Sequence, residues 1–522
     1  MAGSDLAPPR RHAIQIRHLC ALSIVLFEVI FILWFFPYLP MIDLPQHMLT
    51  AKILTHYADP ETAYSHFFTK EWPWNPYSSY FWFAILLEPV LGVHAATRLY
   101  LALGLVLTPL SFWCWLRTAT PGRDAQVIPS TLLLFSLFFY IGLINFLFSV
   151  PFFFFALAFG WKLMEGRRSW RMEAGLALSL LLAYFSHIVT FVVALLVIGG
   201  HWLMFFRNGS VALLLRDAAP AIGASLIYVL TRAREDVPGM TWLYDPFGSR
   251  AAALLMPLNI FNDPFGQTWT YFAEMVGLWI GFLVLTGWGL FGTGRDRRSR
   301  SGTPAGYATA GMLVAAVLFL PSKLGGLGIG LRVSYMALFA LLAVIPPAWD
   351  DRRSLRVLMV VVCALGPVTV GYRLWHFQAE MAQLEAIVAA MPPRQIVLPV
   401  VTEGHSQYFR TYPFHHAATW YNYRKGGTNP YTLARLRHFP VREREQFIPN
   451  PMGEWRAGSF KYDLHQEGVN YFLVRTKRAD IISDLQAHVP LAARVGDWMV
   501  FGPNAAKSGA GSDGRGSAGR IP

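Results

Sequence analysis

Long apolar runs separated by short basic clusters constrain this chain more than any other feature. A membrane-spanning helix needs roughly 20 predominantly apolar residues, and such runs recur between residues 18 and 371. Of the 522 residues, 54% are hydrophobic and only 14% are charged, whereas a soluble chain carries roughly 25% charged residues. We therefore predict a mainly α-helical, polytopic membrane protein.

The basic clusters predict the topology. Arginine-rich loops of membrane proteins lie on the cytoplasmic side, and about eleven spans put every dense arginine cluster there. This topology accounts for the net charge of +13, so we expect no nucleic-acid partner. We expect a multi-pass protein of the cytoplasmic (inner) membrane with a cytoplasmic N-terminus. The expected spans are residues 18–40, 95–116, 127–145, 147–164, 172–185, 189–206, 211–230, one between 270 and 294, 307–321, 334–348 and 355–371.

Composition divides the chain into three parts. Residues 1–371 form the expected transmembrane domain, including an outer loop over residues 41–94 that is too polar to span and has helical spacing typical of interfacial helices. Within this loop, residues 80–93 form a short apolar run that we interpret as a re-entrant or interfacial helix. Residues 372–503 have the composition of a soluble, extracytoplasmic domain, and residues 504–522 are a Gly/Ser/Ala-rich tail expected to be disordered.

The soluble part alternates helical and strand-like segments. This alternation predicts a small α/β domain. The expected helices are residues 374–391 and 479–488, and the expected strands are residues 395–401, 471–475 and 497–501.

Two motifs beyond the first span resemble a known family. Residues 75–82 (Asn-Pro-Tyr-Ser-Ser-Tyr-Phe-Trp) resemble the Pro-aromatic stretch of the GT-C superfamily, and residues 91–99 (Leu-Gly-Val-His-Ala-Ala-Thr-Arg-Leu) resemble its Gly…Ala-x-x-Arg-Leu run. The family includes protein O-mannosyltransferases, aminoarabinose transferases and oligosaccharyltransferases. The resemblance implies a GT-C-like helix bundle that transfers a sugar from a polyprenyl-phosphate donor to a cell-envelope glycan, lipid or protein.

The same resemblance assigns a role to Asp43. In the family, an early-loop Asp is the catalytic base or orients the acceptor, and Asp43 matches that position. Many members carry a second acidic residue beside it, whereas this chain has Leu44 there and His47 one helical turn later.

The residues themselves leave two roles open for Asp43. Sugar transfer with inversion needs a base for the acceptor proton, and a carboxylate near a membrane surface is partly desolvated, which raises its pKa towards a useful range. However, Pro45 predicts a helix start, and Asp43 then stands near the N-cap position. Asp43 and His47 together are also a candidate pair of ligands for a divalent metal ion, although two ligands at this spacing are common by chance. The sequence leaves the metal requirement unknown.

The leaving phosphate needs positive groups, and three residues are candidates. Arg332 follows a glycine-rich segment, Lys323 lies just before it, and Arg98 starts the second expected span. Arginine binds phosphate oxygens in bidentate fashion. The alternative for Arg332 and Arg98 is an anchoring role at the headgroup level.

Five further residues are secondary candidates. Ionisable groups at membrane depth are functional candidates by default, although single examples near helix ends are commonly structural. Aromatic and cationic residues that alternate in the soluble part suit sugar and phosphate binding, or simply a membrane-facing surface. These candidates are His187, Asn145, His405, His415 and His416.

Two other functions remain open at this point. A glycan polymerase or ligase would use His187 and Arg332 in place of a carboxylate. A transporter or an assembly scaffold for envelope polysaccharide would have no catalytic group, and a transporter would have a cavity at the membrane midplane.

Overall fold

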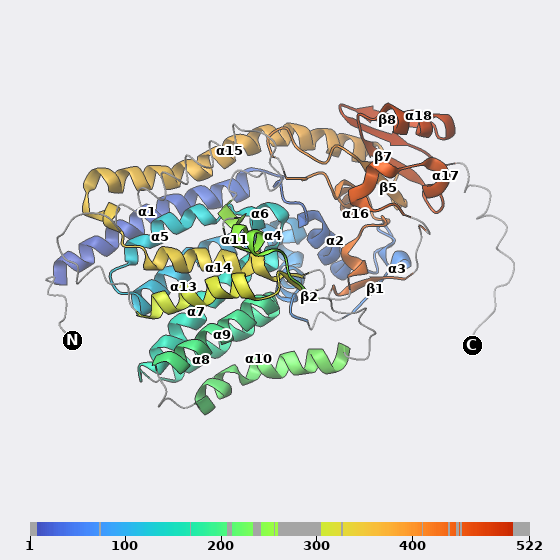
Figure 1. Ribbon diagram of the computed structural model, residues 1–522. Helices are drawn as coiled ribbons and strands as arrows, with labels where there is room; N and C mark the ends of the chain where they lie inside the picture. Colours follow the sequence, from blue (N-terminus) through green and yellow to red (C-terminus); the bar gives the residue numbers. More distant parts are fainter. Residues whose placement is uncertain are drawn as a thin grey trace. The chain divides into compact units, whose positions relative to one another are not determined.

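The computed structural model in Figure 1 is mainly helical. It describes residues 8–71, 75–167, 169–205, 211–232, 242–254, 256–258, 304–324, 327–409, 411–436, 439–444, 448 and 451–504. The chain divides into two compact units. Unit 1 consists of Met1–Phe35, Trp74–Phe83 and Ala95–Tyr372, and unit 2 consists of Phe36–Pro73, Ala84–His94 and Arg373–Pro522.

Unit 1 is a bundle of apolar helices. Its long helices are α1 (Pro8–Phe35), α7 (Ile144–Met164), α8 (Trp170–Ser186), α9 (Ile188–Phe205), α10 (Val211–Arg232), α13 (Pro304–Phe319) and α14 (Ile329–Val344). Its short elements are η1 (Asp124–Gln126), α5 (Val127–Ser130), η2 (Thr131–Leu133), α6 (Leu137–Ile141), β2 (Trp242–Leu243), α11 (Phe247–Ala253), η3 (Met256–Leu258), β3 (Lys323–Leu324), β4 (Leu327–Gly328) and η4 (Ala348–Asp351). Two long helices, α4 (Ser79–Ala119) and α15 (Arg353–Ala390), contribute residues to both units.

Six helical segments of the described residues are long and apolar enough to cross a membrane. They are Ile16–Phe35, Ser79–Ala119, Asp124–Ile141, Ile144–Met164, Ile188–Phe205 and Arg353–Ala390, and shorter apolar helices cover Ala218–Ile227, Pro304–Phe319 and Ile329–Val344. The span expected between residues 270 and 294 lies outside the described residues, as do residues 505–522 of the expected tail.

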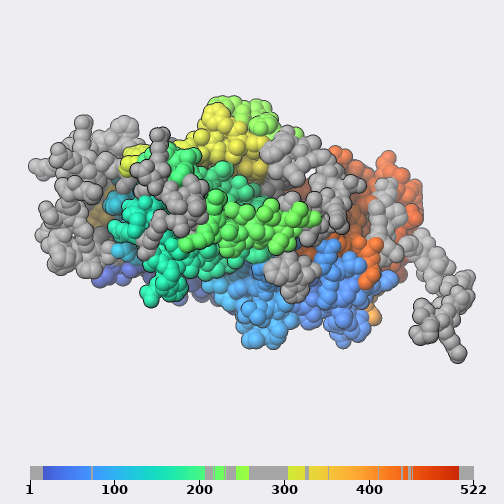
Figure 2. All heavy atoms as spheres, turned by 90° about the horizontal axis from the view of Figure 1, so that it is seen from below, coloured from blue at the N-terminus to red at the C-terminus, as the bar shows by residue number. Residues whose placement is uncertain are grey.

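Exposed apolar side chains are typical of this bundle's surface. Figure 2 shows α10 (green) on one face of the bundle, and its Leu226, Ile227 and Leu230 are exposed. On α1, Phe27 and Phe31 are likewise exposed. Large exposed apolar surfaces are unusual on soluble monomers, so these helix faces suit contact with lipid.

Several predicted helix boundaries were wrong, including that of the first span, since α1 ends at Phe35 and not at residue 40. The run 80–93 continues into the next helix as α4, which bends at Gly92 (φ 71°) because glycine adopts positive φ without steric cost. The expected helix 127–145 is a series of short helices that ends at Gly142 (φ 91°), so Asn145 belongs to α7. Helix α14 starts at Ile329, before the predicted residue 334. The expected helices 355–371 and 374–391 form the single helix α15.

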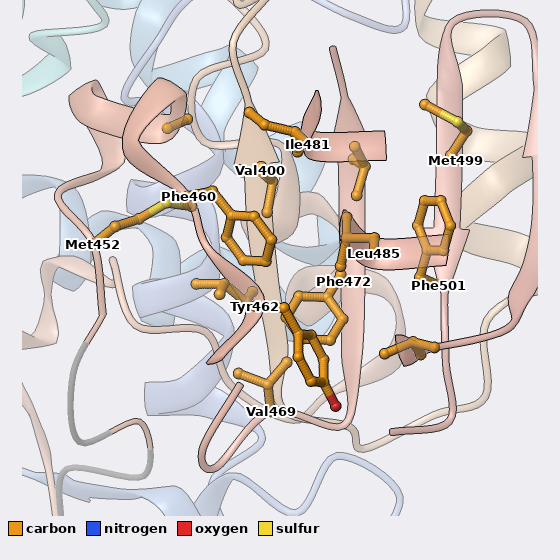
Figure 3. Packing of buried hydrophobic residues seen from close by; sticks show 14 of the residues in the cluster. Val400, Met452, Phe460, Tyr462, Val469, Phe472, Ile481, Leu485, Met499 and Phe501 are labelled. Atoms are coloured by element: carbon orange, nitrogen blue, oxygen red, sulfur yellow. The ribbon is translucent and has the colours of Figure 1, made fainter. Parts of the chain in front are cut away.

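Unit 2 contains a four-stranded sheet in the order β5-β7-β9-β8. Strands β5 (Val397–Val401) and β7 (Tyr471–Arg475) are parallel, whereas β9 (Trp498–Phe501) is antiparallel to β7 and β8 (Leu491–Val495). Helix α18 (Ala479–His488) contributes Ile481 and Leu485 to a buried apolar cluster on this sheet. Figure 3 shows Phe460, Tyr462 and Phe472 packing together with these residues.

Elements from the early part of the chain complete unit 2. They are α2 (Leu44–Thr55), α3 (Tyr64–Phe67) and β1 (Phe68–Lys70). Strand β1 pairs antiparallel with β6 (Val441–Glu443). The remaining elements of unit 2 are α16 (Ala417–Lys425), η5 (Leu433–Arg435), η6 (Glu454–Ser459) and α17 (Tyr462–His465).

Two glycines bring the early segment against the end of α16. Gly426 (φ 75°) and Gly427 (φ 77°) have left-handed backbone conformations, which few other residues adopt. The Gly427 N–H donates to the Thr62 carbonyl at 3.0 Å. A Cβ atom on Gly426 would lie only 2.2 Å from the same Thr62 oxygen. The close approach of these two segments therefore requires glycine.

Candidate active site

Asp43 precedes helix α2, but its side chain does not cap that helix. Pro45 occupies the first turn of α2, and the Asp43 carboxylate makes no capping hydrogen bond. Instead, Asp43 Oδ1 lies 3.3 Å from Nε2 of His416. The side chain is 24% exposed, so the carboxylate remains accessible to another molecule.

His416 also approaches a second carboxylate. Its Nδ1 lies 2.9 Å from Oε2 of Glu454, the first residue of η6. Nε2 of the preceding residue, His415, lies 3.6 Å from the same Glu454 oxygen. Unit 2 thus brings together a carboxylate from the early loop, two histidines before α16 and a carboxylate from η6.

The surrounding charges set the protonation of the two histidines. Burial alone would lower the pKa of His416, but the Glu454 and Asp43 carboxylates outweigh it and raise this pKa to about 10. Burial, together with the charge of His416, lowers the pKa of His415 to about 3. Burial raises the pKa of Glu454, and His416 opposes this effect. At neutral pH, His415 is therefore neutral and His416 shares positive charge with two carboxylates.

A buried amide fixes the start of α2 in this position. Gln46 Nε2 donates to the Tyr431 carbonyl at 2.8 Å, and Gln46 Oε1 accepts from the Leu433 N–H at 3.1 Å. Further along α2, Lys52 Nζ donates to the Tyr423 carbonyl at 2.6 Å and lies 5.0 Å from the centre of the Tyr423 ring. These contacts place Asp43, three residues before Gln46, beside His416.

His47 has a packing role in this arrangement. Its buried ring stacks on Phe439, with the ring centres 5.7 Å apart. Burial lowers the pKa of His47 to about 4, although the Asp43 charge acts in the opposite direction. His47 is therefore neutral at pH 7. Among the described residues, the group able to hold a metal ion comprises His415, His416 and Glu454 and does not pair Asp43 with His47.

Two other predicted residues come together in unit 1. The Arg332 Nε–H donates to Nε2 of His187 at 3.0 Å, which requires the lone pair on that nitrogen and hence the neutral ring with its proton on Nδ1. Arg332 also donates to the Gly328 carbonyl at 2.7 Å and lies 5.9 Å from the centre of the Phe146 ring. Arg332 thus contacts an imidazole, a backbone carbonyl and an aromatic ring.

Two short strands precede Arg332. Lys323 in β3 is exposed and is the register partner of Gly328 in β4. Arg332 stands in the first turn of α14, and its guanidinium bonds back to this hairpin at Gly328. Lys323 and Arg332 thus both contact Gly328, the first by strand pairing and the second by a hydrogen bond.

The other predicted residues contact different groups. Arg98 is buried and donates to the Trp34 carbonyl of α1 at 3.3 Å. Asn145 accepts from the Tyr100 hydroxyl at 3.0 Å and donates to the Tyr77 carbonyl at 3.2 Å, inside the helix bundle. His405 is exposed, and its ring lies 4.1 Å from that of Tyr412.

Glu454 is the member of the site that the sequence did not identify. It lies in a polar stretch, Gly453-Glu454-Trp455-Arg456, without a motif around it. Trp455, the next residue, packs its ring against His415 with centres 3.5 Å apart. The local sequence around Glu454 shows a carboxylate followed by tryptophan, which does not by itself indicate a site. Its role becomes visible only in the fold, where both residues lie beside the histidines.

The comparisons with known proteins concern the fold. No protein-family model and no curated protein matches this sequence. ArnT from Cupriavidus metallidurans bound to undecaprenyl phosphate is similar in structure, with a TM-score of 0.50, 11% identity and coverage of 94% of this chain and 98% of that one. The apo state of ArnT gives a TM-score of 0.49 at 12% identity, over the same shares of both chains. A mutant of the mycobacterial arabinofuranosyltransferase AftD gives 0.47 at 14% identity, over 97% of this chain and 42% of that one.

The similarity to ArnT extends over nearly the whole of both chains. At this level of identity it establishes the fold alone. The predicted fold class, a mainly α-helical bundle with a small α/β part towards the C-terminus, is confirmed, and the fold is similar to that of ArnT.

Proposed function

We propose that this protein is a membrane glycosyltransferase that moves a sugar from a polyprenyl-phosphate donor to a cell-envelope glycan, lipid or protein. The observation that carries the proposal is the Asp43–His416 pair, which leaves an accessible carboxylate beside a largely buried imidazole. The ArnT-like fold supports it, since the ArnT structure of similar fold contains bound undecaprenyl phosphate.

The chemistry assigns a role to each group. Asp43 accepts the proton of an acceptor hydroxyl or amine, the acceptor atom forms a bond to the anomeric carbon, and the bond from that carbon to the donor phosphate oxygen breaks. The polyprenyl phosphate leaves with the electron pair of that bond. Arg332, with Lys323 nearby on its hairpin, is the proposed group for the phosphate, because a guanidinium matches phosphate oxygens in a bidentate fashion.

The proposal also includes the location. The apolar helices of unit 1 support a multi-pass membrane protein. We assign it to the cytoplasmic membrane, with the N-terminus cytoplasmic and both the early loop and the C-terminal domain on the outer side, because the arginine clusters then lie inside.

Release of polyprenyl phosphate tests the proposal. Purified protein in liposomes receives a membrane lipid extract with polyprenyl-phosphate sugars and an envelope fraction as acceptor, and mass spectrometry follows the released lipid phosphate. We expect release by the native protein and its loss in Asp43→Asn. Asp463→Asn, which alters an exposed carboxylate of unit 2, serves as the matched control. Native-like release by Asp43→Asn would refute the assignment of the base.

A glycan polymerase or ligase is the second candidate, because His187 and Arg332 form a direct hydrogen bond. An enzyme of that class would depend on this pair and not on Asp43. The same assay separates the two: loss of activity in His187→Gln with full activity in Asp43→Asn favours the polymerase or ligase.

A further inference from the structure

The cluster of His415, His416 and Glu454 contains more buried polar atoms than its hydrogen bonds satisfy. Within the part of the chain that the structure describes, Nε2 of His415 and Nδ1 of His416 are buried and have no hydrogen-bond partner of acceptable geometry. Both nitrogens nevertheless lie within 3.6 Å of Glu454 Oε2. Buried polar groups without hydrogen bonds destabilise a fold, so two such nitrogens beside one carboxylate oxygen suit a bound ligand.

The donor set and its spacing suit a metal ion. One ligand atom from each of the three residues lies within 4.8 Å of the others. In a tetrahedral zinc site, ligands at about 2.0–2.1 Å from the ion are roughly 3.3 Å from one another. The two measured separations from Glu454 Oε2, 2.9 and 3.6 Å, lie on either side of that value. Two imidazoles and one carboxylate form a recognised set for zinc with an open fourth position.

We infer that His415, His416 and Glu454 bind a divalent transition-metal ion such as Zn²⁺. Asp43 would orient His416 by accepting a hydrogen bond from the ring nitrogen that does not bind the metal. The metal would take Nδ1 of His416, while Nε2–H would face Asp43 Oδ1 at 3.3 Å. Ligating histidines commonly donate their other N–H to a carboxylate, which fixes the ring and makes it a better ligand. On the other histidine, the Trp455 ring, 3.5 Å from that of His415, restricts the orientation.

This inference goes beyond the proposed transfer reaction, because the metal site stands on residues of unit 2 whether or not the protein transfers a sugar. The alternative is a cluster that holds together without a metal ion. Without a metal, a protonated His416 would bridge the Asp43 and Glu454 carboxylates, and added metal would then bind weakly or not at all.

Metal content tests the inference without any sugar substrate. The full-length protein in detergent is treated with a chelator, equilibrated with Zn²⁺ or Co²⁺, and freed of excess ion. We expect one ion per chain by elemental analysis, and an intense visible Co²⁺ spectrum typical of tetrahedral coordination. His415→Gln, His416→Gln and Glu454→Gln are each expected to lose the ion. His488→Gln, which alters an exposed histidine beside Asp484, is expected to retain it.

Asp43→Asn is a further variant for the same experiment, because it leaves all three proposed ligands in place. We expect it to keep one ion per chain at saturating Zn²⁺ with an affinity about 10–100-fold lower, as when other carboxylates that hydrogen-bond a ligating histidine are removed. A native protein that holds no ion after equilibration, or ligand variants that elute as folded monodisperse protein and still bind one ion, would overturn the inference. Failure of sugar transfer with a bound ion would contradict only the proposed function.

Discussion

Oδ1 of Asp43 lies 3.3 Å from Nε2 of His416, although the two residues are far apart in the sequence. The contact joins the loop after the first apolar helix to the C-terminal part within unit 2. Because His416 also lies 2.9 Å from Glu454, any change at Asp43 alters the charge balance of the whole cluster.

Gln46→Ala is expected to destabilise unit 2. The buried Gln46 amide satisfies the Leu433 N–H and the Tyr431 carbonyl, and leaving a buried group unsatisfied costs about 1–3 kcal/mol. Thermal unfolding followed by intrinsic fluorescence should show a lower Tm than for the native protein. Gln486→Ala, at an exposed position of α18, should leave the Tm unchanged. Equal Tm values for the two variants would contradict the claim that the Gln46 hydrogen bonds stabilise unit 2.

Gly426→Ala is expected to destabilise the protein by more than the small size of the added methyl group suggests. The residue has φ 75°, and the new Cβ would lie 2.2 Å from the Thr62 oxygen. Backbone strain at such a position alone costs about 1–3 kcal/mol, and the clash adds to it. Gly248→Ala in α11, where nothing lies within 4 Å of the Cβ and φ is not positive, is the matched control. A thermal melt in which both alanine variants match the native protein would show that the close approach to Thr62 does not matter.

The lowered pKa of His47 is expected to make the folded protein less stable at acidic pH. Its pKa is about 4 in the folded protein and about 6.5 when unfolded, so the unfolded state binds the proton first. Stability is therefore full above pH 6.5 and decreases by up to about 3 kcal/mol as the pH falls towards 4. His47→Phe retains a ring against Phe439 and removes this titration. The variant should show a smaller decrease of Tm between pH 6.5 and 4, and an unchanged pH dependence would refute this role.

Local patterns predicted the helices and strands well where one segment decides its own structure. Strand β7 and helix α18 have the predicted boundaries, because apolar alternation and helical periodicity are local properties. The boundaries around Gly92 and Gly142 were less predictable, because a glycine can either end a helix or bend it, and packing decides which.

The candidate site was predictable only in part. Asp43, His415 and His416 were all named from the sequence, but as separate candidates. Their association depends on the two hydrogen bonds of the Gln46 amide and on the close approach of Gly426 to Thr62. Both contacts join segments that are distant in sequence. Glu454 had no motif of its own, and His47, at helical spacing from Asp43, packs on Phe439 instead.

The most direct test of the central claim is the rate of polyprenyl-phosphate release by Asp43→Asn at saturating donor and saturating Zn²⁺. Saturation separates loss of the base from weaker binding of donor or metal. If Asp43 is the general base, the rate should fall at least about 100-fold relative to the native protein, while Asp463→Asn retains the native rate. A native rate in Asp43→Asn, with equal protein in the liposomes, would contradict the account.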